Sequence, residues 1–212
     1  MKDGNWRKFY SNFSYLDVLR DNSVHAYYLF RILMNRPKKA LEVGCGTGSQ
    51  SIFLSHFVSE VCGVDKDEEL IGLAKKLRGK RNKKTKFVHG DAFNLPLKDK
   101  SFDLCFSQGF FEHFSDAEII SLCNEQLRVA DKIIFSVPSD NYFCKDFGNE
   151  RLLSPQRWEN ILEKMDEVKI NVKYYPFDLG LRSKIRIFKK THSLLQMFTK
   201  PLHVIGEVKK LK

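Results

Sequence analysis

The stretch Leu41–Ser49, LEVGCGTGS, decides the fold of this chain. Its apolar run ends in three glycines at alternate positions, Gly44, Gly46 and Gly48. We interpret it as a buried strand, a tight turn and the first residues of a helix, which points backbone N–H groups at a ligand. Glycine has no Cβ, so it permits both the turn and the close approach of that ligand. The stretch therefore predicts a small-molecule site.

Length and composition indicate one globular domain. The chain has 212 residues, of which 42% are hydrophobic and 29% charged, enough to bury a sizeable core. No apolar run resembles a signal peptide or reaches membrane-spanning length. The odd number of cysteines, without a C-x-x-C pair, predicts reduced thiols and a cytoplasmic protein. They are Cys45, Cys62, Cys105, Cys123 and Cys144.

The formal net charge of +10 is concentrated in few places. The segment 75–86 carries eight basic residues and no acidic one. It has two interpretations, a nucleic-acid patch or a solvated helix end and loop. We favour the second, because exposed aromatic residues are missing there.

From Lys39 onward, short apolar runs alternate with helical patterns, which is typical of repeated βα units around a parallel sheet. Two short helices are expected within 6–34, before Pro37. Further helices are expected after a cap at Thr47 or Ser49, after Asp67, over 116–130 and after Ser154-Pro155. For 184–198 we favour a helix, with a strand at 185–188 as the alternative. Strands are predicted at 40–44, 61–65, 87–88, 102–107, 133–137, 168–175 and 202–211.

Ligands of an open α/β sheet bind at the carboxyl ends of its strands. Asp65 ends the second predicted strand about 20 residues after the glycine turn, a position suited to accepting hydrogen bonds from ribose hydroxyls. Asp91 follows the third strand and is placed to accept from an exocyclic amine. The pair suggests an adenosine, although each aspartate alone could simply cap the next helix.

The glycine pattern limits which kinds of nucleotide could bind at this turn. A dinucleotide fold has its third glycine where this chain has Ser49, and no G-x-x-x-x-G-K-[ST] loop is present. Glu42 lies two residues before Gly44, hence on the same strand face. Its carboxylate disfavours a pyrophosphate and favours a ligand with an amino group.

Taken together, four strings resemble class I S-adenosylmethionine-dependent methyltransferases: LEVGCGTGS, VCGVDKDEEL, FVHGDAFNLPLKDKSFDLCFSQGFFEHF and KIIFSVPS. The resemblance runs from about Lys39 to Ser139. It implies an α/β fold of three layers, Rossmann-like, with a seven-stranded, mostly parallel sheet whose last strand is antiparallel. We expect one domain over 1–212, made of an N-terminal helical lid (1–36), a cofactor-binding core (39–139) and a substrate-side insertion with C-terminal strands (140–212).

The resemblance also implies the cofactor-binding residues. The glycines Gly44, Gly46 and Gly48, with Cys45, would cradle the methionine part of S-adenosylmethionine, and Glu42 would reach its amino group through water. The remaining positions are Asp65 and Lys66 at the ribose, Asp91 and Ala92 at the adenine, and Gln108 beside the sulfonium. The product would be S-adenosyl-L-homocysteine, and no metal is expected.

The implied reaction is displacement of a methyl group from a positively charged sulfur by a nucleophile of the acceptor. Alignment of the reactants supplies much of the acceleration, and a base is needed only where the nucleophile must lose a proton. His113 with Glu112 is the candidate base, since a histidine pKa lies near neutrality. The alternative is that His113 only shapes the loop.

The acceptor is less well defined. Aromatic residues near the predicted site favour a small, partly apolar or aromatic acceptor, unless they are core residues. The alternatives are an RNA or protein methyltransferase that uses segment 75–86, or a catalytically silent cofactor-binding scaffold. We expect a monomer or homodimer. The aromatic residues are Trp6, Tyr10, Phe13, Tyr15, Phe110, Phe111, Phe114, Tyr142 and Phe143.

Overall fold

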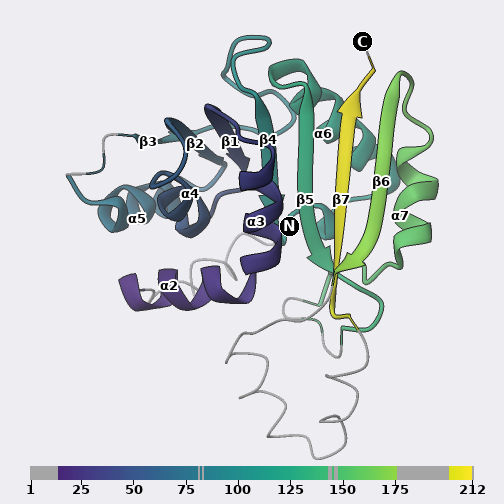
Figure 1. Cartoon of the computed structure of the whole chain (residues 1–212), viewed down its shortest axis with the longest axis horizontal. Coiled ribbons are helices and arrows are strands. Elements are labelled where there is room, and N and C mark those ends of the chain that lie inside the picture. Colours follow the sequence, from purple (N-terminus) through teal and green to yellow (C-terminus); the bar gives the residue numbers. More distant parts are fainter. Residues whose placement is uncertain are drawn as a thin grey trace, which may run out of the picture.

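A computed structural model describes residues 14–80, 82, 84–142, 145, 148–175 and 201–211. From β1 to β5 a helix separates each pair of consecutive strands except β3 and β4, which a loop joins, as the sequence predicts (Figure 1). The helices are α2 (Tyr15–Val24), α3 (Ala26–Met34), α4 (Ser49–Leu54), α5 (Glu68–Arg78), the 3-10 helix η1 (Phe111–His113), α6 (Asp116–Val129) and α7 (Pro155–Leu162). The strands are β1 (Lys39–Val43), β2 (Glu60–Asp65), β3 (Thr85–His89), β4 (Leu104–Gln108), β5 (Lys132–Pro138), β6 (Val168–Tyr175) and β7 (His203–Lys210).

The strands form one seven-stranded sheet in the order β3-β2-β1-β4-β5-β7-β6. The strands β1 to β5 pair in parallel, whereas β7 runs antiparallel to both β5 and β6. This arrangement confirms the predicted fold class, including the antiparallel last strand. The strand order reverses between β1 and β4, which is where ligands of such sheets bind.

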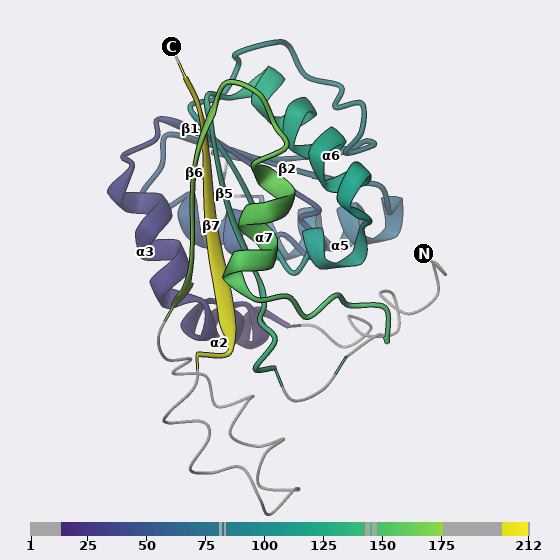
Figure 2. The ribbon, with the colours of Figure 1, turned by 90° about the vertical axis from the view of Figure 1, so that its right-hand side faces the viewer.

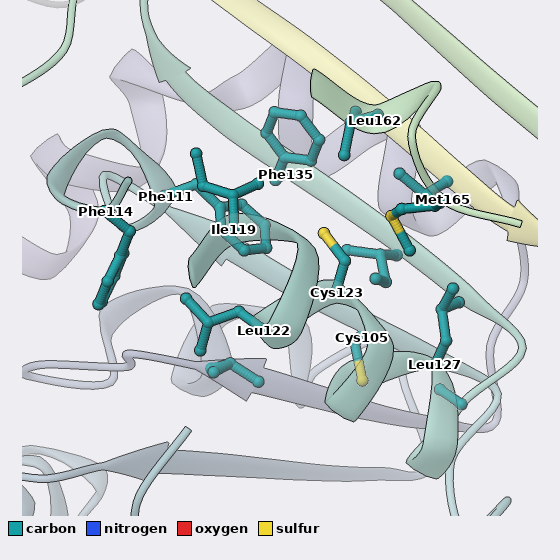
Figure 3. Packing of buried hydrophobic residues seen from close by; sticks show 14 of the residues in the cluster. Cys105, Phe111, Phe114, Ile119, Leu122, Cys123, Leu127, Phe135, Leu162 and Met165 are labelled. Carbon is teal, nitrogen blue, oxygen red and sulfur yellow. The ribbon is translucent and has the colours of Figure 1, made fainter. Parts of the chain in front are cut away.

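Helices cover both faces of the sheet and make three layers, with α3 on one side and α6 and α7 on the other (Figure 2). Under α3, residues such as Ile32, Phe106 and Ile134 form one buried cluster. A larger cluster lies between the sheet and α6 and α7 (Figure 3). It includes Phe135 and Trp158, both fully buried. The sheet is thus packed on both faces, and its carboxyl edge is left for a ligand.

The helix starts test the predicted caps. Ser154 caps α7 as predicted, and α5 begins after Asp67 as predicted, with the Asp67 side chain accepting hydrogen bonds from the backbone of the first turn. The predicted cap at Thr47 or Ser49 is wrong. The N-cap of α4 is Gly48, at φ +69° and without a side-chain hydrogen bond, because the chain enters the helix in the left-handed region that glycine tolerates.

Other predictions are confirmed or fall outside the described residues. The two short N-terminal helices are present as α2 and α3. The fourth strand begins later than predicted, since Phe102 makes only an isolated bridge to Ala130. The prediction for 184–198, and those for Trp6, Tyr10, Phe13, Phe143 and Cys144, lie outside the described residues.

The four described cysteines, one of which is Cys45, are buried and free, as expected for reduced thiols. Burial raises their thiol pKa values, so they stay protonated. None of the helices in the described part of the chain is long and apolar enough to cross a membrane.

Candidate functional site

The glycine turn after β1 has a left-handed backbone conformation, which glycine adopts more easily than other residues do. Gly44, Gly46 and Gly48 all have positive φ, at +71°, +51° and +69°. A Cβ on Gly44 would lie 2.4 Å from the Phe110 ring, and one on Gly48 would lie 2.3 Å from the Phe87 ring. Any larger residue would therefore meet both backbone strain and a steric clash. The turn is built for close approach, by neighbouring rings as well as by a ligand.

Asp65, at the end of β2, holds two parts of this edge together. One carboxylate oxygen accepts a hydrogen bond from the Gly46 amide at 2.8 Å, and the other accepts from the Asp67 amide at 2.9 Å. Burial raises the pKa of Asp65, although these two hydrogen bonds oppose the shift. Each carboxylate oxygen can accept a second hydrogen bond, so the group remains able to bind a pair of hydroxyls.

Glu42, on β1, is buried and faces α4. Its carboxylate accepts hydrogen bonds from the Ser51 amide at 3.0 Å and the Ser51 hydroxyl at 2.5 Å. It therefore lies at the first turn of α4, where the helix dipole favours a negative charge. The neighbouring Tyr28 hydroxyl has its pKa raised by burial and by the Glu42 carboxylate. The Glu42 carboxylate thus lies beside the glycine turn, on the face of β1 that the sequence predicts.

The residues predicted at the ribose and adenine lie at neighbouring strand ends. Asp65 and His89 are register partners on β2 and β3, so Asp91 follows directly on the adjacent strand. The Asp91 carboxylate accepts from the Phe93 amide at 2.9 Å, within its own turn. Lys66 and Asp91 are exposed, and Ala92 is half-buried. The sheet therefore brings this predicted set to one edge.

At the end of β4, the candidate base residues are enclosed. Glu112 and His113 have almost fully buried side chains, and their Oε1 and Nε2 atoms are 3.9 Å apart. Burial raises the pKa of Glu112 to about 8, and the nearby Glu150 adds to the rise. Burial lowers the pKa of His113, while its Nδ1 lies 3.1 Å from the Asn149 side-chain oxygen. The pair is placed as a neutral acid beside a neutral imidazole.

The aromatic residues after β4 divide into core and edge. Phe111 and Phe114 are buried in the cluster next to α6 (Figure 3), which confirms the core alternative for these two. Phe110 is half-buried and lies over Gly44. Tyr142 contacts the ring of His203 at the start of β7. Of the predicted aromatics whose side chains the structure describes, Phe110 and Tyr142 are the two that are not part of this core cluster's buried interior.

Residues 41–132 match the family model described as a methyltransferase domain. A relative, the demethylmenaquinone methyltransferase of Staphylococcus aureus, is 44% identical over 68 residues. That match covers 31% of this chain and 28% of the relative, so the chain spans little more than a quarter of the relative's length. The matched region contains the glycine turn and the ends of β2, β3 and β4.

Residues 41–132 are thus similar to a methyltransferase domain, and the sheet that contains them has the class I methyltransferase strand order.

Solved structures agree with this domain in fold. A chain of the complex between the Haloferax volcanii Trm112 methyltransferase activator and a methyltransferase has a TM-score of 0.70. The alignment covers 99% of this chain and 95% of that one, at 14% identity. The plantazolicin methyltransferase BpumL, solved with S-adenosylhomocysteine, has a TM-score of 0.63 at 19% identity, covering 100% and 92% of the two chains. At such identities the likeness establishes the fold alone.

The residues of the methyltransferase domain fit an S-adenosyl group at this edge. At Gly44 the Phe110 ring occupies the space that a Cβ would need, so only glycine lets the turn lie directly under that ring. The side-chain oxygens of Asn22 and Gln50 are buried beside the start of α4 without a hydrogen-bond partner in the described part of the chain. Together with Glu42 they form a set of acceptors suited to an ammonium group.

Sequence reasoning missed several residues that lie near the same edge. Asn22 donates to the Ser49 carbonyl at 3.2 Å, and Tyr28 donates to the Ser107 carbonyl at 2.8 Å. His25 lies between them on the chain. No motif marks these residues, because they sit in an ordinary apolar helical pattern. The remaining missed residues are Gln50, Ser136, Tyr175 and His203.

In the described part of the chain, no group of three or more histidine, cysteine or acidic side chains is arranged to hold a metal ion.

Proposed function

We propose that this chain transfers a methyl group from S-adenosylmethionine to a small-molecule acceptor. The observation that carries the proposal is Asp65, whose carboxylate is fixed by the Gly46 and Asp67 amides beside the glycine turn. This places a partly buried hydrogen-bond acceptor next to a turn that admits a ligand closely. A ribose with both hydroxyls free is the group that such a carboxylate binds.

Further residues would hold the rest of the donor. Gly44, Cys45, Gly46 and Gly48 would face the methionine part. Glu42 would attract the amino group, directly or through water. At the other strand ends, Lys66 would contact the ribose of the donor and Gln108 would lie at its sulfonium. Asp91 and Ala92 would contact the adenine.

When bound, S-adenosylmethionine supplies an electrophilic methyl group, and the protein aligns the acceptor with it. One candidate proton acceptor is His113, whose neutral imidazole is oriented by Asn149. Glu112, with its pKa raised to about 8, would be protonated at neutral pH and would orient the loop by hydrogen bonding. A base in a low-dielectric site works best when its neighbours keep it neutral beforehand.

A small-molecule acceptor has support from the relatives. Two similar proteins, a demethylmenaquinone methyltransferase and the plantazolicin methyltransferase BpumL, are named after small-molecule acceptors. The basic segment 75–86 supports a macromolecular acceptor less well. Arg78 donates to the Thr85 carbonyl, and Lys86 pairs with Glu60, so both have structural roles. The basic residues of the last turn of α5 also suit the negative end of the helix dipole.

The donor assignment is tested by calorimetry with S-adenosylhomocysteine. Asp65→Asn should weaken its binding about 100-fold or more, because hydrogen bonds to a charged carboxylate contribute about 1.5–3 kcal/mol each. Asp67→Asn is the matched control. Asn caps a helix as well as Asp does, so α5 and the affinity should both persist. Equal affinity of the Asp65→Asn variant and the unchanged chain would refute the donor assignment.

Catalysis is tested separately, with methyl-labelled S-adenosylmethionine and fractionated extracts. We expect label in the small-molecule fraction. Label in RNA or protein, lost on charge reversal of 75–86, would favour the macromolecular alternative. Binding without transfer to any fraction would favour the scaffold alternative.

A further inference from the structure

Two histidines meet in the interior where α2 turns into α3. His25 and His203 are 6% and 5% exposed, and their ring centroids are 5.4 Å apart with the planes at 80°. They are 178 positions apart in the chain. Neither belongs to the glycine turn or to the Glu112 pair, and the donor-binding proposal uses neither. Their role therefore needs a separate explanation.

The pair lies at the carboxyl edge of the sheet. His203 begins β7, and its register partners are Pro138 and Tyr175, the last residues of β5 and β6. Ser136 connects this end to the donor side. It is the register partner of Gln108, and its hydroxyl lies 2.9 Å from the Tyr175 hydroxyl. The histidines thus lie further along the carboxyl edge of the sheet, which runs from Gln108 across the end of β5.

The same helices that carry His25 also contact the donor side. Asn22, three residues before His25, donates to the Ser49 carbonyl at the start of α4. Tyr28, three residues after it, donates to the Ser107 carbonyl near the end of β4. Asn22 is in α2 and Tyr28 is in α3, so these two contacts hold the α2–α3 turn over the strand ends. His25 is therefore fixed between the glycine turn and the ends of β5 to β7.

Flat rings surround the two imidazoles. Tyr175 stacks on His203 at 5.4 Å and 20°, and Tyr27 stacks on Tyr175 at 5.3 Å and 12°. Tyr142 meets His203 edge-on at 5.6 Å. Stacked and edge-on rings are the contacts that another planar ring makes favourably. The surroundings suit an aromatic group better than a flexible chain.

One nitrogen of the pair is unsatisfied. The Nδ1 atom of His25 is buried without a hydrogen-bond partner in the part of the chain that the structure describes. A buried polar atom left in this way costs about 1–3 kcal/mol, so a native protein retains one chiefly for a ligand or a function. Burial lowers the pKa of His25 to about 4 and that of His203 to about 3. Both rings are therefore neutral at neutral pH, and each has a ring nitrogen with a lone pair that can accept a hydrogen bond.

We propose that His25, His203, Tyr142 and Tyr175 bind the ring of an aromatic acceptor, and that His25 receives the proton of the acceptor's hydroxyl group. This inference rests on the proposed function and specifies its acceptor class. His25 would contact the hydroxyl, and His203 would position His25. The site is separate from His113, which lies beside Asn149 after β4.

The chemical balance is simple. The O–H bond of the acceptor breaks, and its proton moves to the imidazole of His25. The oxygen forms a bond to the methyl carbon as the sulfur–carbon bond breaks, which leaves a neutral thioether and a methyl ether. The positive charge passes from sulfur to the imidazolium, which burial destabilises, so the proton is released to solvent.

Binding of phenol, catechol and 4-nitrophenol tests the proposal without knowledge of the natural acceptor. Each is compared with its O-methyl ether, which keeps the ring and lacks the hydroxyl proton; for catechol the dimethyl ether is used. Affinities are measured on the full chain with and without S-adenosylhomocysteine, below the pKa of each phenol. We expect at least one phenol to bind about tenfold more tightly than its ether, the loss that an unpaired buried polar group brings.

His25→Leu should abolish that preference and leave the affinity for S-adenosylhomocysteine unchanged. His203→Phe, which keeps a ring in the stack, should reduce the preference less. The matched control is His56→Leu, at an exposed histidine after α4, and it should change nothing. Because the phenols are also measured without S-adenosylhomocysteine, failure of donor binding and failure of this proposal give different results.

Two outcomes would overturn the proposal. One is that no phenol binds more tightly than its ether. The other is that His25→Leu keeps the preference, which would assign the histidines to packing alone. Thermal unfolding of each variant shows whether its fold is intact, and His25→Gln, which keeps a polar side chain, replaces a variant that does not fold.

Discussion

The two halves of the carboxyl edge are built differently. In the donor half, at the ends of β1 to β3, the main carboxylates already have partners: Asp65 accepts from two amides and Glu42 accepts from Ser51. In the acceptor half, at the ends of β4 to β7, buried atoms of His25 and Glu112 have no hydrogen-bond partner among the described residues. The donor half fixes its carboxylates through its own chain and leaves only the amide oxygens of Asn22 and Gln50 without a partner among the described residues, whereas the acceptor half leaves a histidine nitrogen and a carboxylate oxygen without one.

The difference follows from distance along the chain. Glu42 and Ser51 are 9 residues apart, and Asp65 and Gly46 are 19 apart. The contact between Tyr28 and Ser107 joins residues 79 apart, in the acceptor half. A short motif can specify the first kind of contact, whereas the second depends on how distant elements pack.

The largest expected effect tests the donor half. Gly48→Ala should lower the free energy of unfolding by about 3–5 kcal/mol, since it combines left-handed strain with overpacking against Phe87. Gly72→Ala is the control: it lies within α5 with nothing within 4 Å of the added Cβ, and should stabilise the chain by about 0.5–1 kcal/mol. Urea denaturation measures both. If Gly48→Ala left the free energy of unfolding unchanged, the turn would relax easily, and the donor half would be less constrained than its contacts indicate.

The next effect concerns pH and the acceptor half. The pKa of Glu112 is raised to about 8, so its contribution to stability is complete below its unfolded pKa and is lost as pH rises toward 8. Between pH 6.5 and 8 we expect the free energy of unfolding to fall by about 1–2 kcal/mol, since a pH unit is equivalent to at most about 1.4 kcal/mol. Glu112→Gln should flatten this fall, as followed by denaturation at several pH values.

His25 and His203 act in the opposite direction. Their lowered pKa values give stability that is present above the unfolded histidine pKa and is lost as pH falls toward 4 and then 3. The chain should therefore be most stable near pH 6–7, about where the rise in stability from the two histidines stops outweighing the fall from Glu112. A Glu112→Gln variant whose pH profile matches that of the unchanged chain would mean that Glu112 is ionised in the fold.

The smallest expected effect refines the comparison. Tyr175→Phe keeps the stack on His203 and removes the hydrogen bond to the Ser136 hydroxyl. The loss should be about 1 kcal/mol in stability, typical of a single neutral hydrogen bond. Ser136→Ala should cost a similar amount, and the double variant should cost less than the sum of the two. Additive losses would indicate that the two hydroxyls do not interact.

Much of the fold was predictable because its signals are local. Asp67 and Ser154 precede apolar helical patterns and cap α5 and α7, and β6 spans the predicted residues. The predicted cap at Thr47 or Ser49 failed for a local reason too. A side-chain cap was expected where the backbone instead turns through a left-handed Gly48. Where residues with hydroxyl groups flank a glycine, the sequence does not show whether a side chain or the glycine backbone begins the helix.

The sequence by itself determined the α/β fold, the glycine turn and the acidic residues at the strand ends. These features depend on neighbouring residues and on the two-residue and 3.6-residue periodicities of strands and helices. Only the tertiary structure decided which distant side chains meet: that Phe110 lies over Gly44, that Phe111 is core, and that His25 reaches His203. Such contacts depend on helix docking and strand order, which no local pattern records.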